Sequence, residues 1–313
     1  MAGKYLVADI GGTNTRVGLA DDTGLIEETT RRYQNAENAS FETVLEAYLQ
    51  DAQPGELAGA CAGAAGPVQQ GVAQMTNLDW HIDYNVLQKM TGAKVTDVIN
   101  DLPAQGLALD DLTEASTRVL KEGTASDGPR LVVGLGTGMN IVPVHRVGGE
   151  LVAPSCEGGH ASLPYRADQA ALCDWLKQEC GYPSIEVALA GQGIENLYRF
   201  HNGTALSAAK IMAEFYAKEP AARAAMADYM ALLGAVIGDY ALSHLPFGGI
   251  YLTGGVSRAI APHMSALGFQ AAMADKGGFS ELAGSFPVIL IEDDFAALKG
   301  CARHLRQLTA RAV

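Results

Sequence analysis

Two apolar runs flank a glycine turn at the start of the chain. Lys4–Ala8 is the first run, Val17–Ala20 is the second, and the segment between them contains the paired Gly11 and Gly12. This order predicts a strand, a tight turn and a returning antiparallel strand. Paired glycines leave the backbone amides unshielded, so an anion can approach them closely. The chain is therefore expected to begin with a hairpin whose turn suits a phosphate group.

Polar side chains in the same turn leave two interpretations open. Asp9 places a carboxylate at the end of the first strand, where a hydrated divalent cation fits. Thr13 adds a hydroxyl donor. Asp, Thr and paired glycines are also ordinary residues of a plain turn. Only the rest of the chain can decide between a plain hairpin and a metal–phosphate site.

Composition and charge narrow the class of protein. A chain of 313 residues, 48% of them hydrophobic, can bury a large core and is expected to divide into two lobes. The net charge of −13 argues against a surface for nucleic acid or an anionic membrane. The five cysteines are irregularly spaced and include no Cys-x-x-Cys, which predicts reduced thiols in a cytoplasmic protein rather than disulfides or zinc. We recognise no signal peptide, and Met230–Leu242, interrupted by Asp239, predicts a buried helix rather than a membrane span.

Strand-like and helix-like segments alternate, which predicts an α/β fold. The expected strands are Lys4–Ala8, Val17–Ala20, Leu57–Gly66, Val95–Ile99, Arg130–Val133, Ile141–Val144, Glu150–Ala153, Gly249–Thr253 and Pro287–Ile291. The expected helices are Phe41–Leu49 with Ser40 as N-cap, a helix with Pro103 in its first turn, Ala221–Leu245 and Phe295–Leu308. The strand before Gly134–Gly138 enters a second glycine-and-threonine turn, so the opening hairpin is repeated in coarse form.

Common nucleotide-binding and hydrolase motifs are absent. The sequence contains no Gly-x-x-x-x-Gly-Lys-Ser/Thr and no Gly-x-Gly-x-x-Gly, which disfavours a P-loop and a dinucleotide-binding fingerprint. It also contains no His-Glu-x-x-His and no Gly-x-Ser-x-Gly. A nucleotide would therefore be held by glycine hairpins.

Three further segments place polar residues beside apolar runs or glycines, where they could take part in a site. Asp101 follows Asn100 at a strand end, where it is either a helix N-cap or a general base kept ionised by the helix N-terminus. Two glycines separate Glu157 from His160, and such a bend can turn both side chains toward one point. Glu186 precedes another apolar run. A solvated surface position remains the alternative for Glu157 and Glu186, and a structural role remains the alternative for His160.

Six segments in this order resemble the bacterial glucokinases of the hexokinase–actin superfamily. Asp9–Arg16 and Gly134–Gly138 resemble the two phosphate loops of that family, and Thr253–Val256 resembles its adenosine loop. Ile99–Asp101, Glu157–His160 and Ser184–Gly191 resemble its sugar-binding segments. The resemblance implies a two-lobed actin-like ATPase (ribonuclease H-like) α/β fold with a central interdomain cleft. The small domain would be residues 1–109 plus 296–313, and the large domain residues 110–295.

The resemblance also implies an activity, an ATP-dependent transfer of phosphate to the 6-hydroxyl of glucose, with Mg²⁺ as the metal. Asp101 would be the catalytic base. The sugar would be bound by Asn100, Asp101, Glu157, His160 and Glu186. Nucleotide phosphates and adenosine would be bound by Asp9, Gly11, Gly12, Thr13, Asn14, Gly136, Thr137, Gly138, Gly254 and Gly255, with Asp9 also serving the metal. Glucose and ATP would be the partners, without nucleic acid or membrane, in a cytoplasmic protein expected to form a homodimer.

The sequence departs from the family pattern in four places. Met139-Asn140 replace Leu-Gly after the second phosphate loop, which could stiffen that loop or shift the nucleotide. The other departures are Leu102-Pro103, Cys156 and Glu292–Phe295. Three alternatives therefore stay open: a kinase for another hexose, a non-catalytic sugar or nucleotide sensor, and an actin-like ATPase. No cysteine-rich zinc motif follows His160, which disfavours the ROK branch of sugar kinases, and the early first strand leaves no room for a helix-turn-helix.

Overall fold

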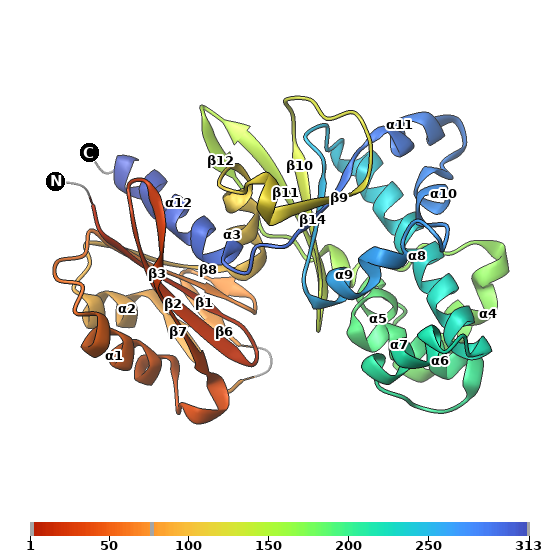
Figure 1. Ribbon diagram of the computed structural model, residues 1–313, viewed down its shortest axis with the longest axis horizontal. Coiled ribbons are helices and arrows are strands. Elements are labelled where there is room, and N and C mark those ends of the chain that lie inside the picture. Colours follow the sequence, from red (N-terminus) through yellow and green to blue (C-terminus); the bar gives the residue numbers. More distant parts are fainter. Residues whose placement is uncertain (1–2, 76–77, 312–313) are drawn as a thin grey trace. The chain divides into compact units, whose positions relative to one another are not determined.

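The chain forms two compact α/β units in a computed structural model that describes residues 3–75 and 78–311 (Figure 1). The first unit contains Met1–Thr113, Arg146–Ser155 and Asp293–Val313. The second contains Glu114–His145 and Cys156–Glu292. Each unit has its own sheet and its own hydrophobic core, as a chain of this length requires.

The first unit is built on a five-stranded sheet of order β3-β2-β1-β4-β8. The strands are β1 (Tyr5–Ile10), β2 (Asn14–Asp21), β3 (Gly24–Gln34), β4 (Gly59–Ala64) and β8 (Val95–Asn100). β1 and β2 form the predicted antiparallel hairpin, in which Asp9 lies opposite Arg16. β1, β4 and β8 are parallel neighbours. β3 was not predicted, because this edge strand is mostly polar and half-exposed and lacks an apolar run.

Alternation along β1 sorts its side chains between two faces of the sheet. Leu6 and Ile10 pack in the core that contains the buried side of α1 (Phe41–Ala52), and Val7 packs in the core of α12 (Ala296–Arg311). Figure 1 shows α1 and α12 on opposite faces of this sheet. With a period of two, Asp9 points to the same side as Val7. The predicted N-cap of α1 is confirmed, because Ser40 accepts a hydrogen bond from the Thr43 amide.

Helix α12 packs unusually closely against α3 (Asp101–Leu107). A Cβ built on Gly300 would lie 1.7 Å from the carbonyl oxygen of Ala104, closer than any side chain can approach. Glycine at this position lets the two backbones meet. The helix that begins at Asp101 is therefore fixed by main-chain packing against the C-terminal helix.

The remainder of the first unit is a small appendage to this sheet. β5 (Val68–Gln69), β6 (Val72–Gln74) and β7 (His81–Asp83) form a three-stranded antiparallel sheet, which leads into α2 (Tyr84–Thr91). The Arg146–Ser155 segment contains β12 (Glu150–Val152), which does not join this sheet but is an edge strand of the six-stranded sheet, next to β11 (Met139–Val147). β12 follows Gly148-Gly149, where both residues have positive φ.

The second unit repeats the strand arrangement of the first. β10 (Arg130–Leu135) pairs antiparallel with β11 (Met139–Val147) and parallel with β13 (Ile250–Thr253). β14 (Val288–Ile291) extends the parallel part, and β9 (Thr117–Lys121) closes the edge antiparallel to it. A hairpin followed by a parallel strand thus occurs in both units, so the predicted repeat of the hairpin is confirmed.

Helices fill most of the second unit after residue 167, and the predicted helix Ala221–Leu245 is among them. They are α4 (Ala170–Cys180), α5 (Ile185–Leu189), α6 (Gly191–Asn202), α7 (Ala208–Tyr216), α8 (Pro220–His244), α9 (Gly255–Ile260), α10 (Phe269–Ala274) and α11 (Ser280–Ser285). By length and mean hydropathy α8 alone, among the described residues, could cross a membrane, but 61% of its most apolar window is buried in the protein. α8 is therefore a core helix, as predicted for Met230–Leu242. All five cysteines are free thiols.

Candidate active site

The predicted site residues fall into two sets, one in each unit, and the first set begins with the turn between β1 and β2. Its carbonyl groups are held by Asn35, whose side chain donates to the oxygen of Gly11 at 2.7 Å and whose amide donates to the oxygen of Thr13 at 2.9 Å. Thr15 in turn donates to the Asn35 side chain at 2.8 Å. Within residues 3–75 and 78–311, the amides of Gly12 and Thr13 have no hydrogen-bond partner. A turn with occupied carbonyls and unoccupied amides suits an anion.

Asn35 was not recognised from the sequence. It is 3% exposed and follows the unpredicted strand β3, so no pattern connected it with the glycine turn. Its buried side chain makes two hydrogen bonds, to the Gly11 carbonyl and to the Thr15 hydroxyl, which fix the two ends of the turn. The side chain of Asn14, also predicted to meet phosphate, accepts a hydrogen bond from Arg32 at 3.0 Å.

Asp9 lies at the end of β1 with its side chain 16% exposed. Burial raises the pKa of this carboxyl, and the Arg16 guanidinium, 3.2 Å away, acts in the opposite direction. In the described part of the chain no three acidic, histidine or cysteine side chains gather as a metal cluster. That agrees with Mg²⁺ chemistry, since Mg²⁺ is commonly bound by one or two carboxylates, water and substrate phosphates. The single Asp9 carboxylate fits such a site.

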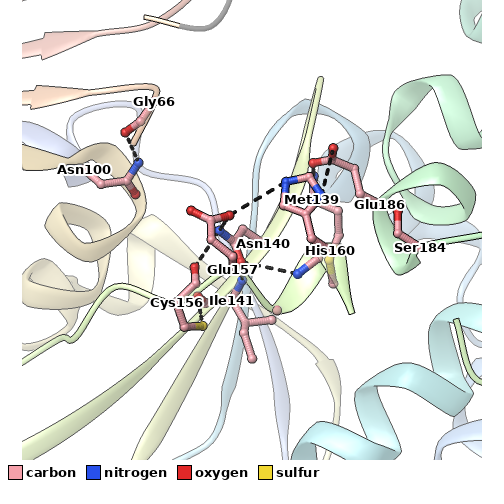
Figure 2. Close-up of polar contacts among 12 residues, drawn as sticks. Gly66, Asn100, Met139, Asn140, Ile141, Cys156, Glu157, His160, Ser184 and Glu186 are labelled. Atoms are coloured by element: carbon pink, nitrogen blue, oxygen red, sulfur yellow. Dashed lines mark hydrogen bonds and ion pairs between the residues drawn. The ribbon is translucent and has the colours of Figure 1, made fainter. Parts of the chain in front are cut away.

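Asn100, and not Asp101, caps helix α3. The Asn100 side-chain oxygen accepts from the Leu102 amide at 3.1 Å, and its nitrogen donates to the Gly66 carbonyl at 2.9 Å (Figure 2). Asp101 is the first residue of the helix. The alternative that Asp101 serves merely as an N-cap is therefore wrong, because its neighbour performs that role. The Asp101 carboxylate is left available for chemistry.

The pKa of Asp101 is raised to about 7, first by burial and second by the negative charge of Asp9. Backbone amides of Leu102 and of Asp101 itself act in the opposite direction and are too weak to offset the burial. The helix N-terminus was expected to keep this carboxylate ionised, and its amides do lower the pKa, but burial and the Asp9 charge outweigh them. A carboxylate with a pKa near neutrality is well matched to accept a proton at physiological pH.

The second set begins with the turn between β10 and β11. The Gly136 carbonyl accepts from the Gly191 amide at 2.8 Å, and the Gly136 amide donates to the Gly138 carbonyl at 2.9 Å. Among the described residues, no hydrogen-bond partner occurs for the amides of Thr137 and Gly138. This turn therefore has the same character as the first, with fixed carbonyls and amides that can bind an anion.

Gly254 is required by packing where β13 ends. Its φ is +98°, and a Cβ at this position would lie 2.2 Å from the carbonyl oxygen of Leu135. The next residue, Gly255, begins α9 and has no atom within 4 Å of a built Cβ. The first glycine brings two strand ends together, and the second leaves open space beside them.

Glu157, His160 and Glu186 lie together in the second unit (Figure 2). His160 Nε2 is 3.9 Å from Glu157 Oε2, and His160 Nδ1 is 4.0 Å from Glu186 Oε1. The bend between Glu157 and His160 packs directly on β11, because a Cβ on Gly159 would lie 1.7 Å from the Met139 carbonyl oxygen. The predicted convergence of these three side chains is present in the structure, although a sugar-binding role remains a prediction.

The Glu186 carboxylate also contacts the second glycine turn. Its Oε2 accepts a hydrogen bond from the Met139 amide at 2.9 Å (Figure 2). A Cβ on Gly138 would lie 2.8 Å from the same oxygen, so glycine there admits the carboxylate. Glu186 therefore lies both beside His160 and against the second glycine turn, whose Thr137 and Gly138 amides have no hydrogen-bond partner among the described residues.

A separate cavity of about 370 Å³ lies elsewhere in the second unit. None of the predicted site residues lines it. Its cationic side chains are already paired, Arg166 with Asp275 and Lys276 with Asp239. This cavity is therefore not part of the candidate site.

Solved structures define the class of protein. The crystal structure of glucokinase from an Antarctic psychrotroph superposes with a TM-score of 0.87 at 30% identity and covers 97% of this chain and 99% of that one. A ROK family glucokinase from Streptomyces griseus, solved in complex with glucose and AMPPNP, has a TM-score of 0.66 at 18% identity, covers 97% of this chain and 100% of that one, and so shares the fold. The fold is that of the two-lobed α/β sugar kinases, as expected.

Sequence comparison gives the family. The glucokinase family profile matches residues 6–308. The glucokinase of Erwinia tasmaniensis is 31% identical over 99% of this chain and 99% of its own length. The chain belongs to the glucokinase family.

Proposed function

We propose that the two sets of residues described above are the substrate-binding and catalytic groups of a glucokinase. As a member of that family, the chain is an enzyme that uses ATP to phosphorylate glucose. The observation that carries the assignment of roles is the Asp101 carboxylate, which is free of any capping duty and has a pKa of about 7.

Asp101 would accept the proton of the glucose 6-hydroxyl as its oxygen attacks the γ-phosphate. A positioned base of this kind typically contributes about 10²–10⁴-fold to the rate. Asn100 fixes the start of the helix that carries Asp101, and its remaining hydrogen-bonding capacity would serve a sugar hydroxyl.

Glu157, His160 and Glu186 would bind the other sugar hydroxyls. Carboxylates suit this role because each oxygen can accept from a hydroxyl, and the imidazole can donate to one. His160 lies within about 4 Å of both carboxylates, so little reorganisation would be needed to bring the three side chains to one sugar.

The free amides of the two glycine turns would hold the ATP phosphates. In the first turn the amides of Gly12 and Thr13 would donate to the phosphates. In the second turn the amides of Thr137 and Gly138 would do so, and the hydrogen bonds of Gly136 fix the shape of that turn. Gly11 and Asn14 complete the first turn. Gly254 lets the end of β13 pack against Leu135, and Gly255, with open space beside it, would leave the backbone accessible to adenosine. Fixed amides stabilise the charge that develops on the transferred phosphoryl group, because they need not reorient during reaction.

Asp9 would hold Mg²⁺ through its hydration shell. When bound, Mg²⁺ neutralises charge on the phosphates of ATP. The Asp9–Arg16 ion pair keeps the carboxylate oriented, since Arg16 lies opposite it in the hairpin. We further propose that the protein is cytoplasmic, in accord with its five free thiols, and that it forms a homodimer.

An assay with a panel of hexoses tests this function. Purified protein is offered ATP-Mg with glucose, mannose, fructose or glucosamine, ADP release is followed by a coupled reaction, and the product is identified by ³¹P NMR. We expect hexose-dependent turnover, glucose as the best substrate, and phosphate on the 6-oxygen. ADP release without sugar would indicate an ATPase, and sugar binding by calorimetry without turnover would indicate a sensor. Either result would refute the proposal.

A further inference from the structure

Asn140 stands immediately after the second glycine turn, where related sequences were expected to have glycine. It lies on β11 opposite Gly134 of β10. Its neighbour Met139 is 2% exposed and belongs to the core, so the two side chains point to opposite faces of the strand. Methionine for leucine at position 139 exchanges one apolar core residue for another. The change at position 140 adds a whole polar side chain near the site.

The Asn140 amide group forms hydrogen bonds with the sugar-site bend. Its nitrogen donates to the Cys156 carbonyl at 2.7 Å and to Glu157 Oε2 at 2.9 Å. Its oxygen accepts from the Gly159 amide at 3.4 Å and from the Ile141 amide at 2.9 Å. Figure 2 shows this side chain between β11 and the bend. One side chain therefore holds both the backbone of the bend and the carboxylate that the bend carries.

Glu157 depends on this contact for its orientation. Its side chain is 64% exposed, so packing does little to fix it. In the described part of the chain the nearest other partner is His160, 3.9 Å from the same Oε2. Asn140 therefore occupies Oε2, and Oε1 is left free of protein donors within the described residues. A carboxylate held by one oxygen presents the other in a fixed direction.

We propose that Asn140 is a positioning residue for the sugar: it holds the Glu157 carboxylate so that Oε1 is presented to a glucose hydroxyl. This inference rests on the proposed function, because it takes Glu157 as a sugar ligand. Asn140 acts on glucose affinity through Glu157 and does not touch the nucleotide turn with its side chain. The contacts of the Asn140 side chain thus lie in the sugar half of the site, and the effect of Met139-Asn140 on the phosphate loop stays a prediction.

The first test is a set of kinetic constants for Asn140→Ala and Asn140→Gly. Both variants remove the amide group, and we expect KM for glucose to rise about tenfold, since a freed side chain must be ordered on binding. The kcat and KM for ATP should stay within about twofold, because the turn amides are untouched. Asn202→Ala is the matched control, since Asn202 in the same unit also makes two side-chain hydrogen bonds, to Tyr198 and Thr204. It should leave all constants unchanged.

Asn140→Asp supplies a readout that a merely structural role would not change. It places a second carboxylate against Glu157, and the repulsion between the two charges is relieved when one of them is protonated. KM for glucose in this variant should therefore rise as the pH increases from about 4 to about 6, in excess of any change in the wild type. In a double-mutant cycle, Asn140→Ala should have no further effect on KM when Glu157 is already alanine.

Three outcomes overturn the inference. An unchanged KM for glucose in Asn140→Gly, with active wild-type enzyme, refutes the role of Asn140 and leaves the glucokinase function standing. Additive effects of Asn140→Ala and Glu157→Ala refute the coupling between the two residues. If the wild type does not bind glucose by calorimetry, the function and the inference fail together. Circular dichroism and Tm of each variant establish that it is folded.

Discussion

Lowering the pH from 8 to 6 should reduce kcat/KM for glucose about tenfold. The catalytic form of Asp101 is the ionised carboxylate, and its pKa in the free protein is raised to about 7. About nine-tenths of the carboxylate is then ionised at pH 8 and about one-tenth at pH 6, whereas a carboxyl with an ordinary pKa would remain ionised over the whole range. With an ordinary pKa for Asp101, kcat/KM would not change between pH 6 and 8. The raised pKa should instead give the pH profile of kcat/KM an acidic limb, that is, a fall in rate toward low pH, centred near neutrality.

The assay is the initial rate with glucose and ATP-Mg both well below their KM values, so that the ligand-free enzyme predominates, with coupling enzymes in excess at each pH. This regime reports kcat/KM and hence groups of the enzyme free of glucose. Asp9→Asn provides an internal check: it removes the second cause of the raised pKa, so the limb should move to lower pH even if KM for ATP increases. His160→Gln controls for the imidazole, and the limb should persist in it.

A flat profile between pH 6 and 8 would refute this reasoning. It would mean either that Asp101 is well solvated in the working enzyme or that proton transfer from the sugar does not limit kcat/KM. A limb that is unmoved in Asp9→Asn would refute the assigned interaction between the two carboxylates while leaving the burial argument intact.

Three further predictions concern packing and stability. Gly159→Ala should raise KM for glucose at least about tenfold, because its Cβ would overlap the Met139 carbonyl and displace the bend. Gly278→Ala, whose Cβ would have open space around it, is the control, and its KM measured in the same way should not change. Gly300→Ala should lower the free energy of unfolding by about 1–3 kcal/mol in urea titrations, since α12 must move away from α3; an unchanged midpoint would show that the helices adjust freely. Asp101→Asn should raise Tm at pH 8. The pKa of Asp101 is higher in the folded protein than in the unfolded chain, so ionising this carboxyl above the folded pKa costs stability, here at most about 4 kcal/mol, and the asparagine removes this cost. This gain should shrink as the pH falls to 5, and a constant gain would contradict it.

Much of the fold could be predicted from the sequence, because apolar runs indicate the buried strands and helices, and glycines indicate the turns between them. The hairpin around Gly11-Gly12 and its repeat before Gly134 were predicted from these features and are confirmed. The edge strand β3 was missed, because its residues are polar and its existence depends on pairing with β2. Pairing across a sheet is a tertiary effect that local patterns do not contain.

The candidate site was predicted in part. The convergence of Glu157, His160 and Glu186 followed from glycine spacing and family resemblance, and the structure brings them together. The supporting residues Asn35 and Asn140 were not assigned their contacts, since each acts through hydrogen bonds to segments distant in sequence.

The ionisation of Asp101 was also outside the reach of the sequence. Burial around it comes from the packing of separate elements, and the nearby charge comes from Asp9, which lies on another strand. A local argument from the helix N-terminus alone predicted only that the carboxylate is kept ionised, because it left both effects out.

The central claim is that Asp101 is the general base of a glucose kinase, and Asp101→Asn tests it most directly. The measurement pairs glucose binding by calorimetry with the rate of glucose 6-phosphate formation in the same preparation. We predict a Kd for glucose within a few-fold of the wild type and a kcat lower by about 10²–10⁴-fold, since the amide keeps the shape but cannot accept the proton. A variant that binds glucose and turns over at nearly the wild-type rate would contradict the account.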